Sequence, residues 1–194
     1  MQVAIVLYPG MTALDALGPY EVLRGLRDVE LRFVWREVGP IVTDSGVLVI
    51  GATHTFAETT RPDLVLVPGS SASTATLMGD AVVLDWLRSV HEHTRFTTSV
   101  CTGSLILAAA GLLEGRAATS HWAGLPLLGQ FGAQARPAER IVRDGQVWTA
   151  AGVSAGIDLA LTPGDDTIRS EFLLAHPDRA RTSDAGRPMT KATE

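Results

Sequence analysis

Three short apolar and β-branched runs constrain the fold of this 194-residue chain most strongly. They are VAIVLY before Pro9-Gly10, LVLV before Pro68-Gly69, and RFTTSV before Cys101. Continuous runs of this length are typical of parallel strands that are buried on both faces. Segments with helical spacing, such as PYEVLRGLRD and DAVVLDWLRSVHEH, lie between the runs. This alternation predicts an α/β sandwich with a mainly parallel sheet.

The remaining segments predict smaller elements around that sheet. Pro19 is expected near the first position of a helix, with Asp15 in the loop before it. Gly115 is expected to cap the helix that follows Cys101, and Ser154 to start a later one. The other expected elements are a strand over LRFVWREV, a strand in SGVLVIGA that pairs with the segment before it, a strand over AATSHW, a helix from about Ala123, and a hairpin turning at Asp144-Gly145.

The domain is expected to span residues 1–162. Pro163-Gly164 interrupts the last helix of this domain. Residues 163–194 are expected to form a divergent segment with one short helix over DDTIRSEFLLAH and a loose polar tail.

Composition and charge exclude several classes of protein. The formal net charge is -5 with no basic run, so no nucleic-acid partner is expected. The N-terminus lacks a basic leader region, and its apolar run is too short to span a bilayer. A single cysteine excludes an internal disulfide framework. We expect a cytoplasmic protein that does not bind membranes, metals or nucleotides, because metal-ligand clusters and phosphate-binding glycine motifs are absent from the sequence.

Three loops carry residues that could take part in a chemical reaction. They lead from the first run to Asp15, from the second to Gly69 and Ser70, and from the third to Cys101 and Thr102. In parallel sheets, sites form beyond the carboxyl ends of the strands. The three loops should therefore converge if their strands are neighbours.

Cys101 admits two interpretations. Most lone cysteines are buried and inert. However, a residue between a strand and a helix lies on a sharp turn, as nucleophiles of hydrolases do, and Gly103 would let the helix approach closely. The N-terminus of that helix is expected to lower the pKa of the thiol. Position alone does not decide whether Cys101 is a buried, inert residue or a nucleophile.

The other candidate residues also have structural alternatives. Asp15 lies among apolar residues, so burial should raise the pKa of its carboxyl group and let it exchange a proton with a substrate. Gly69, Ser70 and Thr102 offer backbone N–H groups for an anionic intermediate, although a plain turn would contain the same residues. His121, in TSHW, is a candidate base or a structural histidine.

Longer stretches of the sequence resemble a known family. SVCTGSLILAAAGLLEGRAATSHWAG, LDALGPYEVL and RIVRDGQVWTAAGVSAGIDLAL resemble the DJ-1/PfpI superfamily, and within it the isocyanide hydratase branch. The resemblance covers Met1 to Thr162. It implies a flavodoxin-like three-layer sandwich, a homodimer, a nucleophile elbow at Cys101 and a carboxyl partner at Asp15. Thr102 stands where the protease-like branch has histidine, which argues against a peptidase.

The implied activity is hydration of an isocyanide to an N-substituted formamide without a cofactor. The substrate would be a small electrophile. Two alternatives remain: a non-enzymatic redox sensor or regulatory ligand-binding domain, and a glyoxalase-like enzyme. Ser70 departs from the family's usual second glycine, and the segment after Pro163 matches weakly.

Overall fold

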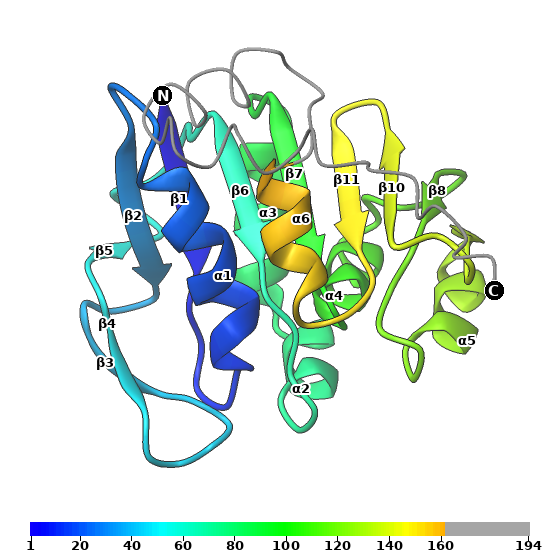
Figure 1. Ribbon diagram of the computed structural model, residues 1–194, viewed down its shortest axis with the longest axis horizontal. Helices are drawn as coiled ribbons and strands as arrows, with labels where there is room; N and C mark the ends of the chain where they lie inside the picture. The colour runs from blue at the N-terminus through cyan, green and yellow to red at the C-terminus, as the bar shows by residue number, and fades with distance from the viewer. Residues whose placement is uncertain (162–194) are drawn as a thin grey trace, which may run out of the picture.

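The computed structural model describes residues 1–161, which form a seven-stranded sheet between two layers of helices (Figure 1). The strand order is β10-β11-β7-β6-β1-β2-β5. Every neighbouring pair is parallel except β10 and β11. The strands are β1 (Gln2–Val6), β2 (Glu30–Trp35), β5 (His54–Thr55), β6 (Leu64–Val67), β7 (Phe96–Val100), β10 (Ile141–Asp144) and β11 (Val147–Ala150).

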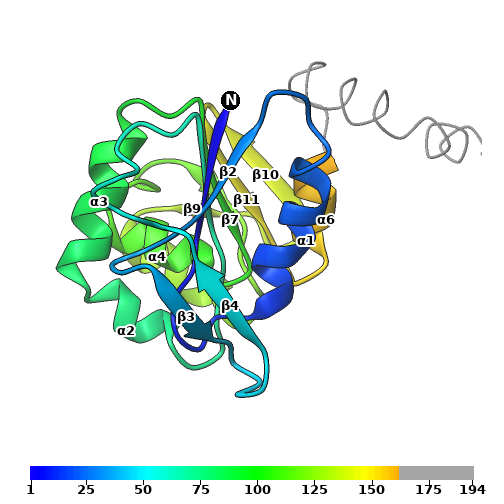
Figure 2. The same cartoon turned by 90° about the vertical axis from the view of Figure 1, so that its left-hand side faces the viewer.

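The helices cover both faces of the sheet (Figure 2). Helices α1 (Ala13–Leu23) and α6 (Ala155–Leu161) cover one face. The other face carries α2 (Thr74–Met78), α3 (Ala81–His91) and α4 (Gly103–Ala109). The smaller elements are the hairpin of β3 (Gly39–Val42) and β4 (Val49–Ala52), the pair β8 (Ala117–Ala118) and β9 (Gln134–Ala135), helix α5 (Leu125–Leu128) and the 3-10 helix Gly129–Phe131. The predicted three-layer, mainly parallel sandwich is confirmed.

The core lies on both faces of the central strands. All four residues of β6 and the last four of β1 are buried, which explains why these runs are apolar without alternation. Asp80 is the N-cap of helix α3, and its side chain accepts a hydrogen bond from the Val83 N–H at 3.3 Å. Both predicted hairpins are also present, at Asp144-Gly145 and between β3 and β4.

Several predicted boundaries are wrong. Helix α1 begins at Ala13, so Asp15 lies in its first turn and Pro19 inside it. Pro19 packs closely on Gly156 of α6, where an added Cβ would come within 3.1 Å of the proline ring. Gly111, with φ +79°, follows the end of α4, where Gly115 was expected. The strand over AATSHW shrinks to Ala117–Ala118, and the helix expected from Ala123 begins at Leu125.

The interruption at Pro163-Gly164 and the helix over DDTIRSEFLLAH lie outside the described residues.

Gly103 is the glycine whose replacement we expect to be most disruptive. A Cβ at this position would lie 2.1 Å from the Val67 carbonyl oxygen and 2.8 Å from that of Pro68. Gly103→Ala should therefore push α4 away from β6 and destabilise the fold by about 1–3 kcal/mol or more. Thermal unfolding measures this loss. Gly129→Ala is the matched control, since Gly129 has φ -62° and no atom within 4 Å of an added Cβ; equal stability of the two variants would contradict the prediction.

Candidate active site

The three loops predicted to converge do so, because β1, β6 and β7 are adjacent in the sheet. All three strands run toward the lower edge of the sheet in Figure 1. The Thr12 N–H donates to the Gly69 carbonyl at 2.9 Å, and the Gly69 N–H donates to Asp15 Oδ2 at 2.9 Å. A Cβ on Gly69 would lie 2.9 Å from Cys101 Cβ. Asp15, Gly69 and Cys101 thus occupy one site.

Cys101 lies on the sharp turn between β7 and α4. Its φ is +60°, a conformation that costs a non-glycine residue about 1–2 kcal/mol. Hydrogen bonds hold the turn on both sides. The Cys101 N–H donates to the Ala150 carbonyl at 3.0 Å, and the Cys101 carbonyl accepts from Ser104 Oγ at 3.3 Å and Ser120 Oγ at 3.2 Å. The predicted elbow geometry is present, and neighbouring groups hold it in place.

The Asp15 carboxyl group is fully buried. Burial raises its pKa from the ordinary 3.8 to about 6, against hydrogen bonds from the Gly69 N–H and with the Cys101 thiol that lower it. Among residues 1–161 no N–H or O–H group donates to Oδ1, the oxygen that Gly69 leaves free. The predicted direction of this pKa shift is confirmed.

The expected low pKa of the Cys101 thiol is wrong. Burial, followed by the negative charge of Asp15, raises this pKa to about 12. Helix α4 has only seven residues, and its N-terminus does not outweigh these two effects. The two groups are coupled: between about pH 6 and about pH 12 they hold one proton and one negative charge between them. Over this range the proton lies on the sulfur, whose pKa is the higher, and the Asp15 carboxylate carries the charge.

Gly69 and Ser70 do not present free donors to a substrate. The Gly69 N–H is bound to Asp15, and the Ser70 N–H donates to Thr74 Oγ1 at 3.1 Å and Thr102 Oγ1 at 3.0 Å. Hydroxyl groups that sequence spacing did not reveal satisfy the Ser70 donor. Ser70 has no positive φ, so serine replaces the family's glycine without strain. The two residues build the loop, and the expectation that they donate to an intermediate is not supported by this geometry.

Within the described part of the chain, His121 makes no hydrogen bond to Cys101 or Asp15. Its Nδ1 accepts from the Ala123 N–H at 3.4 Å, and its ring lies 5.3 Å from that of the exposed Trp122. The neighbouring Ser120, which sequence reasoning missed, is the residue of this loop that contacts Cys101. Sequence reasoning also missed Thr74 and Ser104. All three residues carry a hydroxyl group, and each lies after a strand or at the start of a helix.

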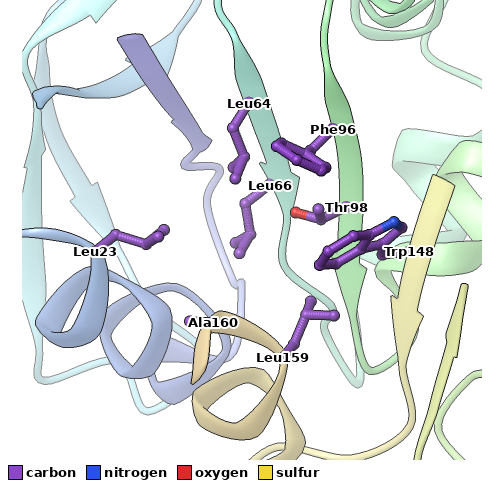
Figure 3. Close-up of a pocket in the computed structure, with 8 residues that line it drawn as sticks. All are labelled: Leu23, Leu64, Leu66, Phe96, Thr98, Trp148, Leu159 and Ala160. Carbon is purple, nitrogen blue, oxygen red and sulfur yellow. The ribbon is translucent and has the colours of Figure 1, made fainter. Parts of the chain in front are cut away.

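The apolar pocket in Figure 3 is separate from this site. It lies between the sheet and helices α1 and α6, and its walls include Leu66, Phe96 and Trp148. Among its described lining residues the single hydroxyl, on Thr98, donates to the Val65 carbonyl at 2.8 Å. These residues offer no group for acid, base or nucleophilic chemistry.

The described part of the chain holds neither a metal-ligand cluster nor a membrane-spanning helix. Residues 1–161 contain no group of three or more His, Cys, Asp or Glu side chains arranged to hold a metal ion. They also contain no helix with the length and apolar character needed to cross a membrane.

A sandwich with a cysteine on the sharp turn after a central strand, beside a buried carboxyl group, defines a class of α/β proteins. The sequence model of the DJ-1/PfpI family matches residues 1–163, and the chain belongs to this family.

Individual relatives agree with this assignment. The chain is 42% identical to an isonitrile hydratase of Pseudomonas putida, over 98% of this chain and 84% of that protein. A ThiJ/PfpI family protein from Pseudomonas syringae has a TM-score of 0.83 and 33% identity, over 100% of this chain and 78% of that one. Drosophila melanogaster DJ-1beta shares the fold, with a TM-score of 0.80 at 18% identity, over 92% and 97% of the two chains.

Proposed function

We propose that this protein is a cofactor-independent hydratase that converts an isocyanide to an N-substituted formamide. One observation carries the proposal: a buried thiol on an elbow lies beside a buried carboxyl group, and between about pH 6 and about pH 12 the pair holds a single proton. The relative named an isonitrile hydratase supports the substrate class, since isonitrile and isocyanide are the same functional group. The reaction needs a nucleophile and a group that moves protons, and Cys101 and Asp15 supply these.

The first step joins the sulfur to the isocyanide. Above about pH 6 the Asp15 carboxylate accepts the thiol proton as the sulfur attacks the terminal carbon. The same proton then passes from Asp15 to that carbon. The product is a thioimidate, in which the former terminal carbon carries one hydrogen, a single bond to sulfur and a double bond to nitrogen. Asp15 is a carboxylate again, so no net proton is gained or lost.

The second step adds water and releases the enzyme. Asp15 removes a proton from water as the water oxygen attacks the thioimidate carbon, and it passes the same proton to the nitrogen, so that Asp15 is a carboxylate again. The carbon–sulfur bond of this tetrahedral species then breaks with its electron pair on sulfur. The hydroxyl proton returns to the sulfur through Asp15, and the N-substituted formamide leaves. Isocyanide and water are the only reactants consumed.

The same geometry argues against a Cys–His mechanism. Thr102 follows the nucleophile, and its side chain cannot act as a base near neutral pH. No hydrogen bond joins His121 to Cys101 or Asp15 in the described residues. Asp15 is therefore the proposed base for both steps.

The pH dependence follows from the pKa of Asp15. Because this pKa is raised from 3.8 to about 6, the pair carries two protons and no charge below about pH 6. The carboxylate that accepts the thiol proton is then missing, and kcat/KM should fall about tenfold per pH unit in acid. Above about pH 6 the rate should reach a plateau. A profile that stays flat down to pH 4.5 in a protein that remains folded would contradict this role of Asp15.

A turnover assay with three reagents distinguishes the proposed function from its alternatives. The purified protein is incubated with an alkyl isocyanide, with methylglyoxal, or with mild peroxide. We expect the formamide from the first and no lactate from the second. Lactate formation without formamide would replace the proposal by a glyoxalase-like activity. Selective gain of two oxygens on Cys101 with neither product would favour the redox sensor.

A further inference from the structure

The peptide unit between Pro68 and Gly69 is held at both ends by residues that lie between the end of β1 and the first turn of α1. At one end the Tyr8 hydroxyl donates to the Pro68 carbonyl at 2.8 Å. At the other end the Gly69 N–H donates to Asp15 Oδ2 at 2.9 Å. The following carbonyl, that of Gly69, accepts from the Thr12 N–H at 2.9 Å. Three hydrogen bonds to one short segment thus fix the orientation of this peptide.

The two ends of this peptide unit cannot turn independently. The peptide bonds of residues 1–161 are all trans. A trans peptide unit is planar, and its C=O and N–H bonds point in opposite directions. A rotation that takes the Pro68 carbonyl away from Tyr8 therefore also takes the Gly69 N–H away from Asp15.

Tyr8 is well suited to hold the carbonyl end. Its side chain is fully buried, and Pro68 and Gly69 are buried as well. Among residues 1–161 no second group donates to the Pro68 carbonyl. Burial raises the pKa of the Tyr8 phenol above its usual value, so the hydroxyl keeps its proton at neutral and acid pH. A buried carbonyl without its donor is costly, so loss of the hydroxyl would favour rotation of the peptide.

We propose that Tyr8 is a positioning residue: its hydroxyl fixes the Pro68–Gly69 peptide so that the Gly69 N–H donates to the Asp15 carboxylate. The role assigned to Tyr8 deepens the proposed function and rests on it, because Asp15 is the proposed base. The Gly69 hydrogen bond stabilises the charged carboxylate and acts to lower the pKa of Asp15, against its burial. Without the Tyr8 hydroxyl this hydrogen bond is weakened, and the carboxylate takes up a proton at a higher pH.

The amide resonance of Gly69 tests the inference without any isocyanide. The Gly69 N–H contacts the carboxylate directly, so its chemical shift in isotope-labelled protein follows the protonation of Asp15. In the wild type we expect a midpoint at about pH 6. In Tyr8→Phe, which keeps the ring and loses the hydroxyl, the midpoint should rise by about one pH unit, the effect of losing one hydrogen bond to a charged group. Asp15→Asn should abolish the titration, which assigns it to Asp15.

Two other ionisable groups act on Asp15, and Tyr8→Phe changes neither of them. One is the Cys101 thiol, whose pKa of about 12 keeps it protonated throughout the titration. The other is Asp44, in the turn between β3 and β4, whose negative charge acts to raise the pKa of Asp15. A change of the midpoint in Tyr8→Phe therefore reports the hydrogen bonding of Asp15.

Tyr20→Phe is the matched control. Tyr20 is the other tyrosine of the chain, and its ring lies 5.2 Å from that of Phe33. Its hydroxyl makes no hydrogen bond among residues 1–161, so this variant should keep the midpoint of the wild type. If Tyr8→Phe does not fold, Tyr8→Met, whose flexible apolar side chain adapts to irregular space, replaces it in the same comparison.

A midpoint in the Tyr8 variant that equals the midpoint in Tyr20→Phe would overturn the inference. A Gly69 amide of the wild type that does not titrate near pH 6 would overturn it as well. If the wild type hydrates isocyanides, the acid limb of kcat/KM in Tyr8→Phe should move together with the midpoint. The amide titration needs no turnover, so the inference and the proposed function can fail separately.

Discussion

Replacement of Cys101 by alanine is expected to abolish formamide production, with a loss of at least about 10³-fold in kcat. The reason is that the proposed reaction passes through a covalent bond to sulfur, and no other cysteine exists in the chain. The elbow should survive the change, because the hydrogen bonds that hold φ at +60° come from the Cys101 backbone. The measurement is the initial rate of formamide release by the folded variant.

Cys101→Ser is a useful companion to the alanine variant. Its hydroxyl matches the thiol in shape but ionises far less readily, so a nearly inactive serine variant would attribute the loss to thiolate chemistry. Thermal unfolding of both variants checks that the sandwich is intact. Formamide release by the alanine variant at the rate of the wild type would refute the covalent mechanism.

Replacement of Asp15 by asparagine is expected to lower turnover by about 10²–10⁴-fold, the usual contribution of a positioned acid or base. The asparagine oxygen can still accept the Gly69 N–H, so the loop contact at 2.9 Å is retained. The amide cannot take a proton from the thiol. The rise of kcat/KM near pH 6 should therefore disappear together with the activity.

The same variant should be more stable than the wild type at neutral pH, which separates catalysis from folding. The Asp15 pKa is about 6 in the folded protein and about 3.8 when unfolded. Stability is therefore fullest below pH 3.8 and is lost as the pH rises toward 6. The loss amounts to about 3 kcal/mol, from about two pKa units. Asp15→Asn should therefore raise the free energy of unfolding above pH 6 by about this amount and change it little near pH 4.

Asp85→Asn is the control for both effects, since Asp85 is an exposed residue that pairs with Arg88 on α3. It should change neither turnover nor unfolding appreciably. If Asp15→Asn were as active as this control, Asp15 would not be the base. If it were less stable than the wild type at pH 7.5, the raised pKa of the buried carboxyl group would be wrong.

The sequence predicted the layers of the fold and the place of the site because both follow from local patterns. Buried parallel strands appear as continuous apolar runs, and neighbouring strands bring their carboxyl ends to one edge. Asp15 and Cys101 were therefore brought together correctly. Pro19 was misplaced because proline is usually found in the first turn of a helix, whereas here it lies in the interior of α1 and packs closely on Gly156 of α6.

The electrostatics of the site were less predictable, because they depend on burial and on partners distant in the sequence. A helix N-terminus predicts a lower thiol pKa, but desolvation and the Asp15 charge together are larger and reverse the sign. The donors expected at Gly69 and Ser70 already have partners, two of which are hydroxyls at Thr74 and Thr102. The hydrogen bonds of Thr74 and Thr102 to Ser70 could be recognised only when the distances between the loops were known.

The covalent intermediate is the most direct test of a cysteine-dependent hydratase. It should be found on wild-type protein quenched during turnover and not on Asp15→Asn protein, because the variant lacks the base that both forms the intermediate and activates water. Acid quenching during incubation with an isocyanide, followed by mass spectrometry of peptides, should show the intact mass of the isocyanide added to the peptide that contains Cys101. Isocyanide mass on a different residue, or formamide produced by the Cys101→Ala protein, would contradict the account.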